Sequence, residues 1–193
     1  MFDRRQRNPF PPGHTYRGVM DTASVLSILF AIAVLGGVPF ILAILALVVF
    51  HRSEAAEPSR FIDPHRKFGN TVTALAGIVV GVLLWVAWIS WGNFEYPTWA
   101  IVGCVVTSVI AVIALGFISR WRWTGSFVGA LGGLFGFSTA CGIQMAHSDD
   151  TALWGVGYMM IVIGGGVVLA LLASGVMLVR MPRMPRTPTM GHP

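Results

Sequence analysis

Charge is scarce in this sequence. Of its 193 residues, 8 are acidic and 13 are Lys or Arg, so charged residues make up 11% of the chain, against roughly 25% in an average soluble domain. Eight acidic residues are too few for the water-facing surface of a soluble protein of this size, and 55% of the residues are hydrophobic. The composition therefore predicts an all-α integral membrane protein whose first partner is the lipid bilayer.

Lysine is almost absent, and the sequence contains no basic patch. Lys67 is the only lysine, and the other twelve basic residues are arginines that flank apolar runs. A nucleic-acid-binding surface gathers its basic residues on one face, so we expect no nucleic acid partner despite the net charge of +5. An arginine bias with abundant Ala, Gly and Val is typical of GC-rich bacteria, and it indicates a bacterial plasma (inner) membrane.

Residue types that carry chemistry are missing from most of the apolar sequence. The four apolar runs after residue 68 hold no Asp, Glu, Lys, Arg or His, although ionisable residues inside a membrane usually mark transport pathways. None of the five histidines lies in mid-membrane, and the two cysteines form no C-x-x-C pair. No Ser-His-Asp set or carboxylate pair falls in one layer of the membrane. We therefore predict no enzyme, no catalytic residue, no metal site and no cofactor.

Five apolar runs organise the chain. The predicted segments are a basic N-terminal tail (1–21), a first apolar segment (22–50), a cytoplasmic basic loop (51–68), a four-helix transmembrane domain (69–179) and a basic, Pro-rich C-terminal tail (180–193). The transmembrane helices of the domain are expected at residues 69–92, 97–119, 125–146 and 152–179. Each has about the 20 residues that a span needs, and the short links predict two antiparallel hairpins. Pro97 and Thr124 are residue types suited to helix starts.

The arginines predict the orientation. Residues 1–20 hold four basic residues, 51–68 hold four, 120–124 hold two and the tail after residue 179 holds three, whereas residues 93–96 and 147–151 hold none. Basic residues stay on the cytoplasmic side of a membrane. We therefore expect a multi-pass protein with its C-terminus in the cytoplasm.

The first apolar segment admits two interpretations. Gly36, Gly37 and Pro39 interrupt it at its centre, where they predict a backbone break. A re-entrant hairpin turning there would keep the N-terminal arginines in the cytoplasm with all the others. One long transmembrane helix kinked at Pro39 is the alternative, because membrane helices tolerate proline. The charge rule favours the hairpin.

Glycines form the most regular pattern inside the predicted spans. Small residues let helix backbones approach closely in a membrane, either within this chain or with a partner. The predicted helix-packing residues are Gly77, Gly81, Gly129, Gly132, Gly133, Gly136, Gly164, Gly165 and Gly166.

Two functions are compatible with these features. The glycine-rich faces and the missing catalytic groups favour a non-enzymatic accessory or scaffold subunit of a larger membrane assembly, with other membrane proteins or a second copy as partners. The alternative is a small oligomeric channel or carrier, which requires a polar pathway. The candidate polar pathway residues are Thr107, Ser108, Ser138, Thr139 and Gln144.

Overall fold

A computed structural model describes residues 22–56, 62, 66, 68–91, 96–148 and 153–180. This part of the chain is helical, with helices α1 (Thr22–Ala56), α3 (Asn70–Trp88), α4 (Thr98–Ile118), α5 (Thr124–Ser148) and α6 (Trp154–Arg180). All five are long and apolar enough to cross a membrane. These apolar helices indicate a membrane-embedded protein, and the described residues contain five candidate spans. A re-entrant first segment would have left four.

Helix α1 corrects the prediction of a break at Gly36, Gly37 and Pro39. The helix runs through these residues without interruption for 35 residues, with Pro39 inside it. Proline lacks an amide hydrogen, so it leaves one carbonyl four residues earlier without its helical partner, and membrane helices tolerate this defect. The helix also extends six residues beyond the apolar segment, which places His51 and Glu54 in its last turns.

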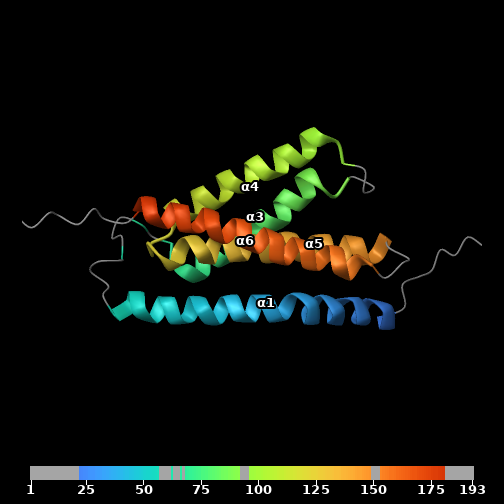
Figure 1. The fold of residues 1–193 in the computed structure, drawn as a ribbon, viewed down its shortest axis with the longest axis horizontal. Coiled ribbons are helices and arrows are strands. Elements are labelled where there is room, and N and C mark those ends of the chain that lie inside the picture. The colour runs from blue at the N-terminus through green and yellow to red at the C-terminus, as the bar shows by residue number, and fades with distance from the viewer. Residues whose placement is uncertain are drawn as a thin grey trace, which may run out of the picture.

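Helix α5 is the centre of the bundle. It packs against each of the other four helices, and half of its apolar stretch is buried, against 11–17% in the others. Glycine, alanine and serine provide much of its buried surface, so neighbouring helices can come close on several sides. Helices α3 and α4 run obliquely to α1, α5 and α6 (Figure 1).

The closest helix contact joins α3 to α5. A Cβ added at Gly77 would lie 2.5 Å from the Gly129 carbonyl oxygen, and one added at Gly81 would collide with the Gly133 carbonyl. From the other side, a Cβ at Gly132 would lie 2.5 Å from the Ala74 carbonyl oxygen. Backbone therefore meets backbone along this seam, and only glycine fits there.

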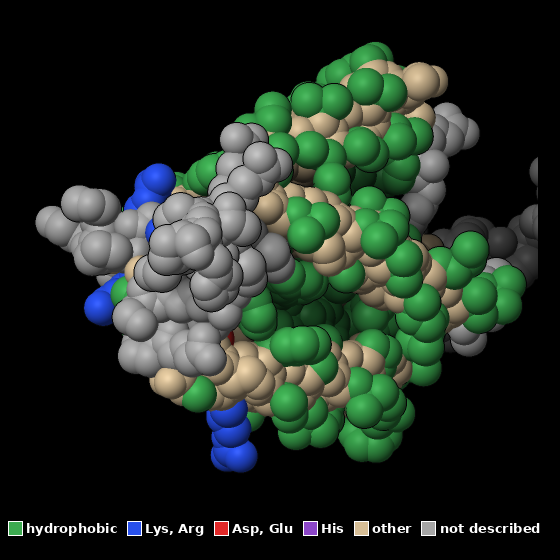
Figure 2. All heavy atoms as spheres, turned by 60° about the vertical axis from the view of Figure 1, so that its left-hand side comes forward, with side chains coloured by type: hydrophobic (Ala, Val, Ile, Leu, Met, Phe, Trp, Pro, Cys, Tyr) green, Lys and Arg blue, Asp and Glu red, His purple; other side chains and the backbone are tan. Residues whose placement is uncertain are grey.

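The two ends of the bundle differ in charge. Consecutive helices run in opposite directions, and α1 ends where α3 and α5 begin (Figure 1). Every Lys or Arg in the described part of the chain lies in or next to that end, and Figure 2 shows blue side chains gathered there. We call it the arginine end; its members are Arg52, Arg66, Arg120, Arg122 and Arg180. Tryptophans 88, 91 and 99 form ring contacts at the opposite, aromatic end.

Candidate functional site at the arginine end

The turn between α4 and α5, residues 119–123, is the meeting point of the arginine end. The Arg120 backbone N–H donates to the Phe68 carbonyl oxygen at 2.8 Å. Isolated β-bridges also join Phe68 to Ser119 and Ile62 to Trp121. The chain leading into α3 is thus fastened to this turn, which is also contacted by α1 and α6.

Glu54 joins the end of α1 to the start of α5. Its side chain has no exposed surface, and its carboxyl oxygens accept hydrogen bonds from the backbone N–H groups of Trp123 (2.8 Å) and Thr124 (3.2 Å). The Thr124 hydroxyl donates a third, at 2.6 Å. The first N–H groups of a helix lack partners within it, and they carry partial positive charge that an acidic group stabilises. Glu54 therefore caps α5 from a different helix.

Arg180 provides the matching contact at the end of α4. Its guanidinium donates to the carbonyl oxygens of Gly116, Ser119 (2.8 Å) and Trp121 (3.3 Å). The last carbonyls of a helix lack partners and carry partial negative charge, so a cation stabilises them. An acidic residue of α1 and a basic residue of α6 thus hold the two helix ends of one turn.

A small polar cluster lies beside this cap. Asn70 Nδ2 donates to the Thr124 hydroxyl oxygen at 3.1 Å and lies 3.3 Å from His51 Nδ1. The His51 ring packs edge-on against Trp121, with ring centroids 4.6 Å apart. Asn70 Oδ1 is buried with no hydrogen-bond partner in the described structure. The cluster connects the starts of α3 and α5 to the last turns of α1.

A cavity of about 590 Å³ opens from this cluster along one flank of α1. We call it the polar-ended groove. Apolar side chains of α1, α3 and α5 line most of it, and polar side chains occur only at the arginine end. Its lining residues are Phe40, Ile44, Leu47, Val48, His51, Arg52, Asn70, Ala74, Ile78, Thr124, Val128, Leu131, Gly132 and Phe135.

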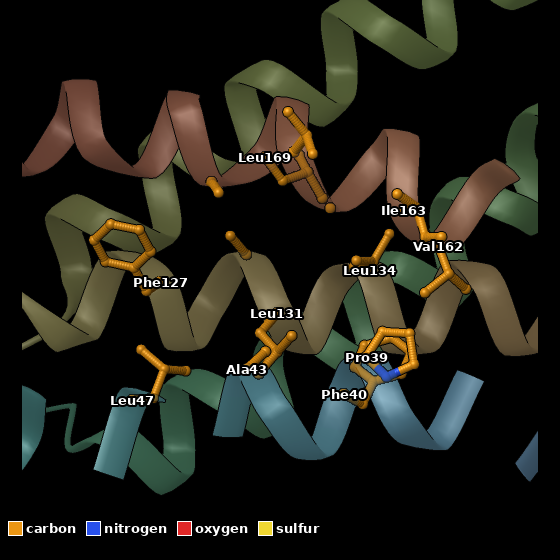
Figure 3. A pocket seen from close by; sticks show the side chains of 14 residues that line it. Pro39, Phe40, Ala43, Leu47, Phe127, Leu131, Leu134, Val162, Ile163 and Leu169 are labelled. Atoms are coloured by element: carbon orange, nitrogen blue, oxygen red, sulfur yellow. The ribbon is translucent and has the colours of Figure 1, made fainter. Parts of the chain in front are cut away.

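A second cavity, of about 330 Å³, lies on the opposite flank of α1, between α1, α5 and α6. We call it the apolar groove, because no charged side chain lines it. Figure 3 shows Phe40 and Leu47 of α1 directed towards Leu131 of α5. These three residues line both grooves, so they form the ridge that separates them. In the view of Figure 2, hydrophobic side chains line a hollow above α1.

Gly36 makes the main close approach of α1 to α6. The Tyr158 hydroxyl occupies the space where a Gly36 side chain would lie, and Tyr158 is 1% exposed. Gly37, the next residue, has open space around it. Gly36 thus serves packing against α6, and neither glycine breaks the backbone of α1.

The candidate polar pathway residues of α4 bond back to their own helix. The Thr107 hydroxyl donates to the carbonyl oxygens of Gly103 (2.7 Å) and Cys104 (3.2 Å). The Ser108 hydroxyl donates to the Cys104 carbonyl at 2.7 Å. Ser108 also lines a cavity of about 280 Å³ between α3, α4, α5 and α6. Among the other candidates, Gln144 lines a cavity of about 580 Å³.

The candidate pathway residues of α5 lie at different places. Ser138 is buried beside Tyr158, and its hydroxyl donates to the Phe135 carbonyl at 3.4 Å. Thr139 is half-buried. Gln144 lies nearer the aromatic end, where Trp85 Nε1 donates to its side-chain oxygen at 2.8 Å. Gln144 thus connects α5 to α3, and the three side chains do not form one polar path along α5.

The predicted packing glycines divide into two groups. Those of α3 and α5 meet at the seam described above. Of the three in α6, a Cβ added at Gly165 or Gly166 would lie 3.1 or 3.4 Å from Leu134, whereas Gly164 is exposed with nothing nearby. Gly164, Gly165 and Gly166 therefore make no close backbone contact with the described residues.

Four residues of this site were not among those predicted from the sequence: Glu54, Asn70, Arg180 and Tyr158. The first three lie at the edges of the apolar segments, where they were assigned to loops, starts or tails. The described residues contain no group of three or more His, Cys, Asp or Glu side chains arranged to hold a metal ion. Comparisons of the chain with protein-family models, curated proteins and solved structures found no match, so the site is interpreted from its own geometry.

Proposed function

We propose that this chain is a non-enzymatic polytopic membrane protein that acts as an accessory or scaffold subunit of a larger membrane assembly. The proposal is carried by glycines whose small size nothing in the described chain uses. Gly164 and Gly175 of α6 are both exposed, and an added Cβ would meet no atom within 4 Å at either. Glycine inside a helix costs about 1 kcal/mol relative to alanine, and a close partner helix would offset this cost.

The positions of these glycines fit one docking line. They are eleven residues apart, which is close to three helical turns, so they lie on the same side of α6. The side chains between them on that side include the exposed Val168 and Leu171. A partner helix placed there would meet two small residues with apolar ones between, which is the usual composition of a membrane helix interface.

Affinity purification from membranes in mild detergent, followed by native mass spectrometry, tests this function. We expect a distinct membrane protein to co-purify, and we expect its yield to fall in the double variant Gly164→Leu, Gly175→Leu. The matched control, Val156→Leu with Ile163→Leu, changes exposed residues on another side of the same helix, about 80 to 100° away from the docking line, and should retain the partner. A chain that purifies only as a monomer would overturn the proposal.

The alternative is a small oligomeric channel or carrier. Its support is the cavity of about 280 Å³ that Ser108 lines between α3, α4, α5 and α6, because a pathway needs internal space and polar groups. A self-oligomer without other subunits in the same experiment would favour this alternative.

The proposed location is a bacterial plasma membrane with the arginine end and the C-terminus in the cytoplasm. Support comes from the basic residues at that end and the aromatic residues at the other. Because α1 is continuous, a full crossing places Arg4, Arg5, Arg7 and Arg17 outside, contrary to the hairpin expectation. In a variant without native cysteines, Gln6→Cys should react with an impermeant maleimide from outside, and Arg183→Cys should react only after permeabilisation. Protection of Gln6→Cys would restore a cytoplasmic N-terminus.

A further inference from the structure

The polar-ended groove has the shape and polarity of one half of a lipid molecule. Its long part is lined by aliphatic and aromatic side chains, and its four polar side chains, His51, Arg52, Asn70 and Thr124, lie at one end only. At the opposite end lie Phe40 and Phe135, whose rings pack edge to face with centroids 5.2 Å apart. An occupant must therefore be apolar over most of its length and polar at one terminus.

The length of the groove matches one leaflet of a bilayer. From His51 to Phe40, α1 runs eleven residues, or about 16 Å at 1.5 Å per residue. The hydrocarbon core of a bilayer is about 30 Å thick, so the groove reaches from one interface to about the middle. This is the depth that an acyl chain of the leaflet at the arginine end occupies.

The charge at the polar end selects the headgroup. Arg52 is exposed, and its guanidinium makes no hydrogen bond or ion pair with the described residues. The nearest acidic side chain in the same helix, Glu54, is buried and already accepts three hydrogen bonds from α5 and the turn before it. Arg52 is therefore free to pair with a phosphate, which guanidinium groups bind well.

We propose that the polar-ended groove binds one acyl chain of an anionic phospholipid, with the lipid phosphate at Arg52. The apolar groove on the other flank of α1 has similar walls but no charged lining residue, so it admits hydrocarbon without selecting a headgroup. The two grooves thus provide a comparison within one molecule. The proposal stands apart from the accessory role, because a lipid can occupy this groove in either an isolated chain or an assembly.

Competition between two lipids tests the proposal. The full chain, stripped of lipid in detergent, is offered an equimolar mixture of phosphatidylglycerol and phosphatidylcholine with different, mass-resolved acyl chains, and the chain lengths are then exchanged. Native mass spectrometry measures the ratio of the two bound lipids. We expect phosphatidylglycerol to be preferred about fivefold, the factor that corresponds to about 1 kcal/mol per basic residue near a membrane surface.

Two pairs of variants locate the bound lipid. Arg52→Gln should abolish the preference, whereas Arg122→Gln removes one charge from the same end outside the groove and should leave it. Val48→Trp places a large ring in the polar-ended groove and should lower phosphatidylglycerol binding at least severalfold. Ile163→Trp fills the apolar groove instead and should not.

The outcomes separate a groove from a charged surface. Equal loss of preference in Arg52→Gln and Arg122→Gln would show that the whole arginine end attracts anionic lipid, and the proposal would fail. Unchanged binding in Val48→Trp, with the thermal transition of the protein preserved, would also overturn it. If Val48→Trp shifts the thermal transition, the milder variant Ile44→Phe repeats the same test from the exposed side of the groove.

Discussion

Two contacts of the same bundle are built in opposite ways. Along the seam between α3 and α5, glycines bring two backbones together over several turns. Helix α1 instead lies on α5 and α6 with a groove on either flank. It is held by a ridge of side chains, by Gly36 against Tyr158, and by Glu54 at its last turn.

The difference shows what each contact can use for stability inside a lipid bilayer. Lipid chains are as apolar as leucine, so burying apolar side chains between helices gains little there. The seam gains from the many close atom pairs of two touching backbones. The contact of α1 with α5 and α6 is stabilised by a few directional interactions, and lipid chains can occupy the space beside them. An added side chain along the glycine seam between α3 and α5 should therefore destabilise the protein, whereas the contact of α1 should be sensitive only at particular residues.

The largest expected effect comes from breaking the seam. Gly81→Leu adds a side chain where the Gly133 carbonyl and the Phe137 amide already lie, so two backbones must separate. We expect a loss of about 3 kcal/mol in the free energy of unfolding, the upper range for overpacking, and much less protein in membranes. Immunoblots of membranes and unfolding in mixed micelles measure both quantities.

Gly164→Leu is the matched control for this variant. It makes the same substitution in another helix, at an exposed glycine with open space around it. The purified chain should keep its stability or gain slightly, because leucine is the better helix former. Similar losses of stability in Gly81→Leu and Gly164→Leu would mean that close backbone packing along the seam is not what stabilises the protein.

The next effect comes from removing the cap that holds the end of α1. Glu54→Gln keeps the size of the side chain, but its amide group would face a backbone N–H as a second donor. Hydrogen bonds to charged groups contribute roughly 1.5–3 kcal/mol, so we expect a loss of about 2 kcal/mol. Thermal unfolding followed by the fluorescence of Trp123 and its neighbours measures it. Ser53→Gln, one residue earlier and exposed, should change stability by less than about 0.5 kcal/mol.

The smallest effect distinguishes two adjacent glycines of α1. In Gly36→Ala the new methyl group meets the buried Tyr158 hydroxyl, and we expect a loss of about 1 kcal/mol. In Gly37→Ala the methyl group enters open space, and better helix propensity should stabilise the protein by up to about 1 kcal/mol. The two midpoints of thermal unfolding should therefore move in opposite directions. A fall in both would indicate that a bend at this pair, and not contact with α6, is what α1 requires.

Much of the fold could be predicted because the lengths of the apolar runs and the positions of the charged residues between them determine where the helices lie. The four expected spans differ from α3 to α6 by only a few residues at each end, since hydrophobic runs of about 20 residues have few other stable forms. Pro97 and Thr124 do mark helix starts. Thr124 nevertheless directs its hydroxyl to Glu54, so its role depends on a residue far away in the sequence.

The first segment was harder, because the sequence contained two conflicting signals. Glycine, proline and the N-terminal arginines predicted a turn, whereas the run of 29 apolar residues predicted a span. The intrahelical bonds of the whole segment outweigh the single bond lost at Pro39. A local break and a packing glycine look alike in a sequence, because both require only a missing side chain.

Glu54 could have been found from its spacing. The buried or half-buried residues of α1 include Phe40, Ala43, Leu47, His51 and Glu54, which recur at intervals of three or four as one face of a helix does. The same face therefore continues past the apolar run into the charged segment. The sequence could not show that this face contacts the first turn of α5, because no residue near Glu54 in the sequence indicates its hydrogen-bond partner.

The packing of α1 against α5 and α6 has a consequence for the order in which the helices assemble. Helix α1 precedes the other described helices in the chain, yet the helices it packs against are α5 and α6, and the donors to Glu54 lie 69 and 70 residues further along the chain. Helix α1 must therefore remain in the membrane without its final packing until α3, α4, α5 and α6 have been synthesised. The Glu54 carboxylate lacks its final partners until the start of α5 has been made. Of the described helices, α1 is thus the first in the chain and among the last to complete its contacts.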